Sequence, residues 1–307
     1  MFRQKIIFIV GPTAIGKTRL AVKLADKING EIISADSMQV YKGMKILSQA
    51  PSFAERKGAR HHLVGLLDPR KEYSVADFRI MATDIISSII RRKKAVIIVG
   101  GSGLYVKALI DGLFPTPKAD LKFRKKMEAF ASKNGLKKLY EKLLKTDQGS
   151  AKLIHPNDKR RIIRALEIYN ATGKTMTELK TETRGLSDIY NIRIYGLIRP
   201  RDEIYPLINS RVERMFGEGL VREVKRFKGK KLSRTAAAIL GYKEVSGYID
   251  GSYDLEAAKE ILKKNTRRFA KRQLTWFRAD HRIQWFDLSK IDNKALIGRI
   301  VKEYHKE

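Results

Sequence analysis

Apolar segments alternate with amphipathic ones along the first third of the chain. The segments 5–10, 31–34 and 95–99 are rich in Ile and Val and predict three buried strands of a parallel sheet. Between them, apolar residues recur at helical spacing over 17–28 and 75–92, which predicts helices there. This alternation of strand and helix is typical of an α/β fold.

The pattern changes at Pro115-Thr116-Pro117. Lysine-rich segments with helical periodicity follow, and no clear strand appears until 191–198. Beyond that strand, the sequence predicts helices at 203–216, 220–227 and 255–278. We therefore expect an α/β core made of residues 1–114 and 190–307, interrupted by a helical insertion at 115–189.

The last of these helices has two unlike faces. Leu262, Phe269 and Trp276 recur at intervals of seven and predict a buried stripe. The other face is cationic and carries Lys264, Arg267, Arg268, Lys271, Arg272 and Arg278. Such a face could follow an RNA backbone or close over a diphosphate, or it could be an ordinary solvated surface above a core stripe.

One motif indicates a specific ligand. It reads Gly11-Pro12-Thr13-Ala14-Ile15-Gly16-Lys17-Thr18 and matches the phosphate-loop pattern G-x-x-x-x-G-K-[ST] directly after the first strand. Backbone N–H groups of such a loop, with the start of the following helix, bind a diphosphate or triphosphate. Lys17 would contact the outer phosphate oxygens, and the Thr18 hydroxyl would complete a Mg²⁺ shell. The alternative is an ordinary strand-to-helix turn with an exposed lysine.

Two further turns reach the same edge of the sheet, where ligands bind in open α/β folds. Asp36 follows the strand at 31–34, and the glycine-rich segment 100–103 follows the strand at 95–99. Asp36 is a candidate base, although it could instead hold Mg²⁺ through water or close a turn. Glycines stand where a second metal-binding acid is usual in phosphate-loop enzymes, which disfavours simple ATP hydrolysis.

Two other candidates are less distinctive. His61 and His62 are adjacent and have no carboxylate at ligand spacing, so we expect a capping or surface pair in preference to a metal site. Arg211 lies on a predicted helix and could contact the oxygens of a leaving group.

Charge narrows the kind of partner. The 64 Lys and Arg residues outnumber the 33 Asp and Glu residues, which leaves a formal charge of +31. Such an excess favours RNA, DNA or an anionic membrane face, although a lysine-rich proteome would give the same total. The chain has no cysteine, which removes disulfides and thiolate metal sites and fits a reducing cytosol. We expect no leader or membrane span, because the first apolar run is too short.

Taken together, these motifs resemble the tRNA dimethylallyltransferases, also called the IPP transferase family. The blocks that carry the resemblance lie at 11–18, 36–44, 61–63, 73–78, 100–105, 157–167, 172–174, 241–244 and 270–276. Two departures stand out. Residues 47–51 read Leu-Ser-Gln-Ala-Pro where the family usually has Gly-Thr-x-Lys-Pro, and Ser102 replaces a threonine.

The resemblance implies a fold and a reaction. The fold is a phosphate-loop core of the nucleotide-kinase type with a helical insertion that binds tRNA. The loop would hold dimethylallyl diphosphate with Mg²⁺, and the exocyclic amine of the tRNA adenine 3′ to the anticodon would attack the allylic carbon to give isopentenyladenosine. Asp36 would be the base, while Thr18 and Arg211 would contact the diphosphate. The predicted helix that carries Arg211 has a less distinctive sequence, so the arginine that contacts the diphosphate could instead be Arg201, Arg214 or Arg222.

The resemblance also implies how the anticodon stem-loop of tRNA is bound, by a monomeric cytoplasmic enzyme. The residues expected to contact tRNA are Asp36, Ser37, Met38, Gln39, Ser102, Arg124, Arg160, Arg161, Ile162, Ile163, Arg164, Gly241, Tyr242, Lys243, Lys271, Arg272 and Arg278.

Three other functions remain open from the residues alone. An isopentenyltransferase acting on free adenine nucleotides would share the core but would need no extended basic surface. A small-molecule kinase would consume ATP. A non-catalytic RNA-binding module would be unaffected by loss of Asp36.

Overall fold

The computed structural model describes residues 3–114, 117, 119–181 and 183–306. Pro115 and Thr116, where we placed the start of the insertion, lie outside these residues. Contacts divide the chain into two compact units, one formed by Met1–Ile110 with Leu186–Glu307 and the other by Asp111–Gly185. Each boundary of the second unit thus lies a few residues before the corresponding boundary of the predicted insertion at 115–189.

The first unit is built on one parallel sheet of six strands in the order β3-β2-β4-β1-β5-β6. The strands are β1 (Lys5–Val10), β2 (Gly30–Ser34), β3 (His61–His62), β4 (Ala95–Gly100), β5 (Asn191–Ile198) and β6 (Ile283–Asp287). The predicted strands and the parallel α/β class are confirmed. β3 and β6 were not predicted, because one has two residues and the other mixes buried with half-buried positions.

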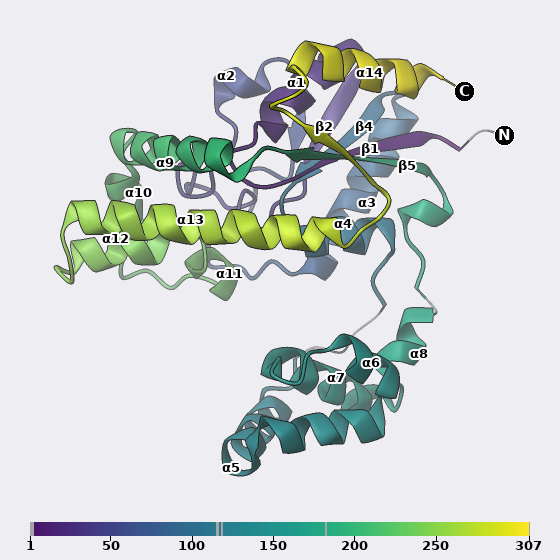
Figure 1. Cartoon of the computed structure of the whole chain (residues 1–307), viewed down its shortest axis with the longest axis vertical. Helices are drawn as coiled ribbons and strands as arrows, with labels where there is room; N and C mark the ends of the chain where they lie inside the picture. Colours follow the sequence, from purple (N-terminus) through teal and green to yellow (C-terminus); the bar gives the residue numbers. More distant parts are fainter. Residues whose placement is uncertain (1–2, 115–116, 118, 182, 307) are drawn as a thin grey trace. The chain divides into compact units, whose positions relative to one another are not determined.

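Helices cover both faces of this sheet (Figure 1). Strand β1 directs Ile6 and Phe8 into one core and Ile7 and Ile9 into the other, as alternation along a strand requires. The helices of this unit are α1 (Lys17–Lys27), α2 (Phe53–Arg56), α3 (Val75–Arg91), α4 (Gly103–Ile110), α9 (Arg201–Gly217), α10 (Leu220–Phe227), α11 (Arg234–Ala237), α12 (Tyr242–Ile249), α13 (Leu255–Arg278) and α14 (Asn293–His305), with a 3-10 turn η1 (Leu186–Asp188). α1 and α14 pack on one face, and α3 and α4 pack on the other.

The predicted buried stripe of α13 was wrong at two of its three positions. Leu262 is buried, but Phe269 is only half-buried and Trp276 is 38% exposed. The buried line includes Leu262, Thr266, Ala270, Gln273 and Phe277. A straight helix drifts by about 20° per heptad, so positions seven apart leave the core over a helix of this length.

The second unit contains helices and no strand among its described residues. It contains α5 (Leu121–Thr146), α6 (Gln148–Leu153), α7 (Lys159–Thr172) and α8 (Met176–Thr181). Leu139 and Leu143 of α5 pack against Ile162 and Ile163 of α7 in a core of its own. Across the described parts of both units, no helix is long and apolar enough to cross a membrane.

Candidate active site

The phosphate loop joins β1 to α1 at the carboxyl edge of the sheet. Gly16 precedes the first helical residue in the left-handed region, with φ +94°, and nothing lies within 4 Å of the position a Cβ would occupy. Glycine is therefore required here by the positive φ and not by any shortage of space for a side chain. No side chain caps the N-terminus of α1. Its first N–H groups and the helix dipole are thus available to an anion.

Lys17 lies folded over this loop. Its ammonium donates to the carbonyl oxygen of Pro12 at 2.7 Å. Burial, reinforced by the nearby positive charge of Arg211, lowers the pKa of Lys17 to about 7. A bound diphosphate would place negative charge beside Lys17 and stabilise its charged form. The arrangement therefore favours a strongly anionic ligand.

Arg211 reaches the same loop from α9. Its Nη1 donates to the Thr13 hydroxyl at 3.2 Å. Burial lowers the pKa of this guanidinium to about 10, which still leaves it charged at neutral pH. Of the alternative arginines, Arg214 forms an exposed pair with Glu218 and Arg201 lies over the Tyr205 ring. Arg222 is exposed. Arg211 thus contacts the phosphate loop, and its contact with a diphosphate stays a prediction.

Asp36 lies directly after β2 on the same edge. Its Oδ1 accepts the Met38 N–H at 2.9 Å. Burial raises the pKa of Asp36, although the charges of Lys17 and Arg211 partly oppose the shift. A carboxylate with a raised pKa is a stronger base than an exposed aspartate.

The turn after β4 packs closely against the Asp36 segment. The Ser102 hydroxyl accepts the Ser37 N–H at 3.3 Å. A Cβ on Gly100 would come within 2.1 Å of the Ala35 carbonyl oxygen. The second acid that is missing from this position therefore could not fit without moving β2. Gln39 is held nearby, because its Oε1 accepts the Ser34 hydroxyl at 2.8 Å.

Gln273 is the residue that the sequence interpretation missed. It is 6% exposed on α13. Its Oε1 accepts the Thr13 N–H at 2.9 Å, and its Nε2 donates to the Gly101 carbonyl oxygen at 3.0 Å. One side chain thus connects the phosphate loop with the turn after β4. A polar residue on the core side of an amphipathic helix was the signal, and the incorrect stripe concealed it.

The histidine pair forms β3 and lies beside Ile32 and Ile33 of β2. His62 Nε2 lies 2.7 Å from the buried Glu31 carboxylate, and His61 Nδ1 lies 2.9 Å from the Ala59 carbonyl oxygen. Burial acts to raise the pKa of Glu31, but hydrogen bonds from Arg92, His62 and Lys94 outweigh it and hold this pKa at about 2. We expected a capping or surface pair in preference to a metal site, and the structure shows a half-buried pair bound to Glu31 and Ala59.

Mg²⁺ would find few protein ligands here. Among the residues that the structure describes, no group of three or more His, Cys, Asp or Glu side chains could hold a metal ion. Mg²⁺ in phosphate-transfer sites commonly binds one or two protein oxygens, substrate phosphates and water. The half-buried Thr18 hydroxyl at the start of α1 fits that donor set.

The expected RNA contacts in the first unit are a mixture of exposed and supporting residues. Lys243, Lys271, Arg272 and Arg278 are exposed, as are Lys264 and Arg268. Gly241 is buried, and its N–H donates to Glu244. The cations are therefore accessible to solvent, whereas Gly241 is the N-cap residue of α12.

The expected contacts in the helical unit need a correction. Ile162 and Ile163 are 0% and 5% exposed and pack in its core, so their side chains do not face a ligand. Arg124 donates to Glu167 through Nε and Nη2, each at 2.8 Å, and Arg164 also binds this carboxylate. Arg161 lies beside Asp158, and Arg160 is exposed.

The fold and site together define an α/β phosphate-loop core with a helical insertion. A model of the IPP transferase family matches residues 39–280, which is more than half of the chain. The chain belongs to this family. The matched range includes Arg211 and Gln273 and begins after Asp36 and the phosphate loop.

Individual relatives support the same assignment. The chain is 48% identical over 300 residues to a tRNA dimethylallyltransferase of Halothermothrix orenii, covering 97% of this chain and 92% of the relative. It is 45% identical over 291 residues to that of Bacillus subtilis, covering 94% and 92%.

Solved structures agree with the fold. The full-length tRNA isopentenylpyrophosphate transferase of Bacillus halodurans superposes with a TM-score of 0.72 at 42% identity, covering 98% of this chain and 95% of that one. A eukaryotic dimethylallyltransferase acting on tRNA gives a TM-score of 0.80 at 30% identity, covering 97% and 78%. The parallel sheet and inserted helices are therefore a family architecture.

Proposed function

We propose that this protein transfers a dimethylallyl group from dimethylallyl diphosphate to a tRNA adenine. The acceptor is the exocyclic amine of the adenine 3′ to the anticodon, and the product is isopentenyladenosine. The observation that carries the proposal is the convergence of the phosphate loop, Arg211 and Asp36 at one sheet edge. Relatives named tRNA dimethylallyltransferase, up to 48% identical over nearly the whole chain, support it.

The leaving group accounts for the positive half of this site. The allylic C–O bond breaks and its electron pair stays on the diphosphate, whose charge therefore increases. N–H groups at the start of α1, the Lys17 ammonium and the Arg211 guanidinium are positioned to bind those oxygens. Mg²⁺ held by Thr18 would add charge stabilisation there.

Asp36 accounts for the other half. An exocyclic amine is a weak nucleophile, because its lone pair is delocalised into the adenine ring. As the new C–N bond forms, the nitrogen becomes acidic and must lose a proton. In this proposal the Asp36 carboxylate accepts it, and burial, which raises its pKa, makes it a stronger base.

The acceptor follows from the charged surface. A free nucleotide would need only the site itself, whereas exposed cations on α13 extend well beyond it, namely Lys264, Arg268, Lys271, Arg272 and Arg278. RNA would neutralise such a face and release its counterions. tRNA is therefore preferred to AMP as the acceptor.

An acceptor panel tests the proposal. The purified protein is incubated with labelled dimethylallyl diphosphate and Mg²⁺, together with unmodified tRNA, AMP or ATP. Label in tRNA alone is the expected result. Label in AMP or ATP would instead indicate the free-nucleotide enzyme, and ADP formation without transfer would indicate a kinase.

A further inference from the structure

The longest helix of the helical unit is bent around a hollow. α5 is interrupted at Gly135, whose φ of +82° and ψ of 159° lie in a region that only glycine adopts readily. Two arms, 121–134 and 136–146, meet at this residue. A hollow of about 510 Å³ lies against them, within the size range of small-ligand sites.

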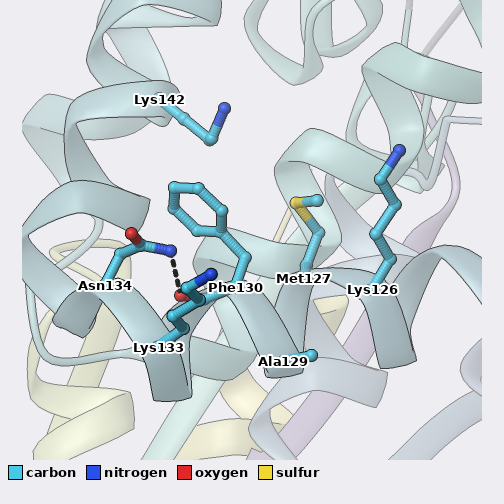
Figure 2. A pocket seen from close by; sticks show the side chains of 7 residues that line it. All are labelled: Lys126, Met127, Ala129, Phe130, Lys133, Asn134 and Lys142. Atoms are coloured by element: carbon cyan, nitrogen blue, oxygen red, sulfur yellow. Dashed lines mark hydrogen bonds between the residues drawn. The ribbon is translucent and has the colours of Figure 1, made fainter.

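The lining of this hollow is cationic and partly aromatic (Figure 2). It consists of Lys126, Met127, Ala129, Phe130, Lys133, Asn134 and Lys142. The lining includes no acidic residue. None of its three lysines forms an ion pair with a described residue, whereas Lys138 on the same helix is paired with Glu141 at 3.3 Å.

One lysine of this lining lies over the aromatic ring. Lys142 comes from the second arm, and its ammonium lies 4.7 Å from the centroid of the Phe130 ring on the first arm. The Asn134 amide donates to the Phe130 carbonyl oxygen at 3.0 Å and so holds the end of that arm. In Figure 2, Lys142 lies above the ring, and Lys126 stands farther along the first arm, with Met127 between it and Phe130. The hollow thus combines positive charge with a half-buried aromatic surface.

We propose that this hollow binds a stretch of tRNA backbone, with phosphates on the lysines and a ribose or base against Phe130. Lysines neutralise phosphates without reading sequence, and an aromatic ring accepts any base by stacking. The inference rests on the proposed function, because it takes tRNA as the substrate. It adds a contact distinct from Arg124 and the 160–164 segment.

Binding of unmodified tRNA over a range of salt concentrations tests this site. The variant Lys126→Gln/Lys133→Gln/Lys142→Gln is compared with Lys125→Gln/Lys137→Gln/Lys145→Gln, which removes the same charge from exposed positions of α5 outside the hollow. For the first variant we expect a Kd raised about 10-fold or more, and a log Kd against log salt slope reduced by about 2. The control should change the Kd by no more than about 2-fold. Equal effects in both variants, or no effect in either, would overturn the site.

Two further readouts keep the test specific. Phe130→Leu preserves an apolar side chain and should still weaken tRNA binding, by about 5-fold, if a base or ribose stacks on the ring. In the lysine variant, the KM for tRNA should rise while the KM for dimethylallyl diphosphate stays constant. Failure of the wild-type protein to transfer any prenyl group would reject the proposed function, whereas the binding comparison would still decide the site.

Discussion

Burial shifts the pKa values of Lys17 and Asp36 in opposite directions. Loss of water disfavours the charged form of each, so the pKa of Lys17 falls to about 7 and that of Asp36 rises. Each side chain performs its proposed role only in its charged form. The free protein therefore holds both groups nearer to their titration points than exposed residues would be.

The pH dependence of kcat/KM follows from these shifts. As pH falls through the raised pKa of Asp36, the base is lost. As pH rises through about 7, the Lys17 ammonium is lost from the free enzyme. We expect a bell-shaped profile for dimethylallyl diphosphate, with an acidic limb set by Asp36 and a basic limb near pH 7 set by Lys17. Lys17→Arg should be slower and should lose the basic limb, because arginine stays charged throughout. A basic limb unchanged in that variant would contradict the role of Lys17.

Gln273 shows how a distant residue can position the phosphate loop. Its side chain accepts a hydrogen bond from the Thr13 N–H, and the Thr13 hydroxyl accepts one from Arg211. The loop and the arginine are thus connected through one residue. Removing the glutamine would leave a buried N–H without its partner and would loosen both groups.

Gln273→Ala should therefore impair use of the donor more than use of tRNA. We expect kcat/KM for dimethylallyl diphosphate to fall by about 10- to 100-fold, with a smaller change in the KM for tRNA. Thr266→Val is the matched control, since Thr266 is also buried on α13 but its hydroxyl binds only the Leu262 carbonyl oxygen of its own helix. Steady-state kinetics with each substrate varied in turn would measure this. Similar losses in both variants would reduce Gln273 to a packing residue.

At this scale a local pattern allows a prediction of chemistry, whereas distant partners of a residue were missed. The phosphate loop is contiguous, so its pattern alone indicated an anion site. Gln273 binds residues far away in the sequence, and no local pattern contains that information. The same limit explains Ile162 and Ile163, whose burial depends on packing against α5.

Helices and strands with one strong pattern were predicted closely. β5, α10 and α13 have the predicted bounds, because apolar periodicity and their end residues agree. β6 and α14 were missed: the strand is short, and its place in the sheet comes from pairing with β5. Pairing of this kind is set by tertiary structure and is weakly encoded in a short segment.

The interruption of α5 gives a prediction about stability. Gly135→Ala should destabilise the protein by about 1–3 kcal/mol, because its φ and ψ are accessible almost only to glycine. No atom lies within 4 Å of the added Cβ, so conformational strain is the sole cause. Gly173→Asn is the control, since φ +69° and ψ −4° suit asparagine as well. Denaturant unfolding would measure both, and equal losses would argue against the strain.

For the whole molecule, charge and organisation indicate one kind of substrate. The formal charge of +31 is carried by both units, on α13 in one and on α5 and α7 in the other. Composition alone could not separate a polyanion partner from a generally basic surface. In the structure, positive charge is concentrated on the exposed face of α13 and in the hollow of α5, and both surfaces suit RNA.

The most direct test of the central claim is mass spectrometry of the tRNA product. Unmodified tRNA is incubated with dimethylallyl diphosphate, Mg²⁺ and either the wild-type protein or Asp36→Asn, and the anticodon-loop fragments are then sequenced. We predict one dimethylallyl group on the adenine 3′ to the anticodon with the wild-type protein, and little or none with the variant. A prenyl group at another nucleotide, no prenyl group at all, or full activity of Asp36→Asn would contradict the account.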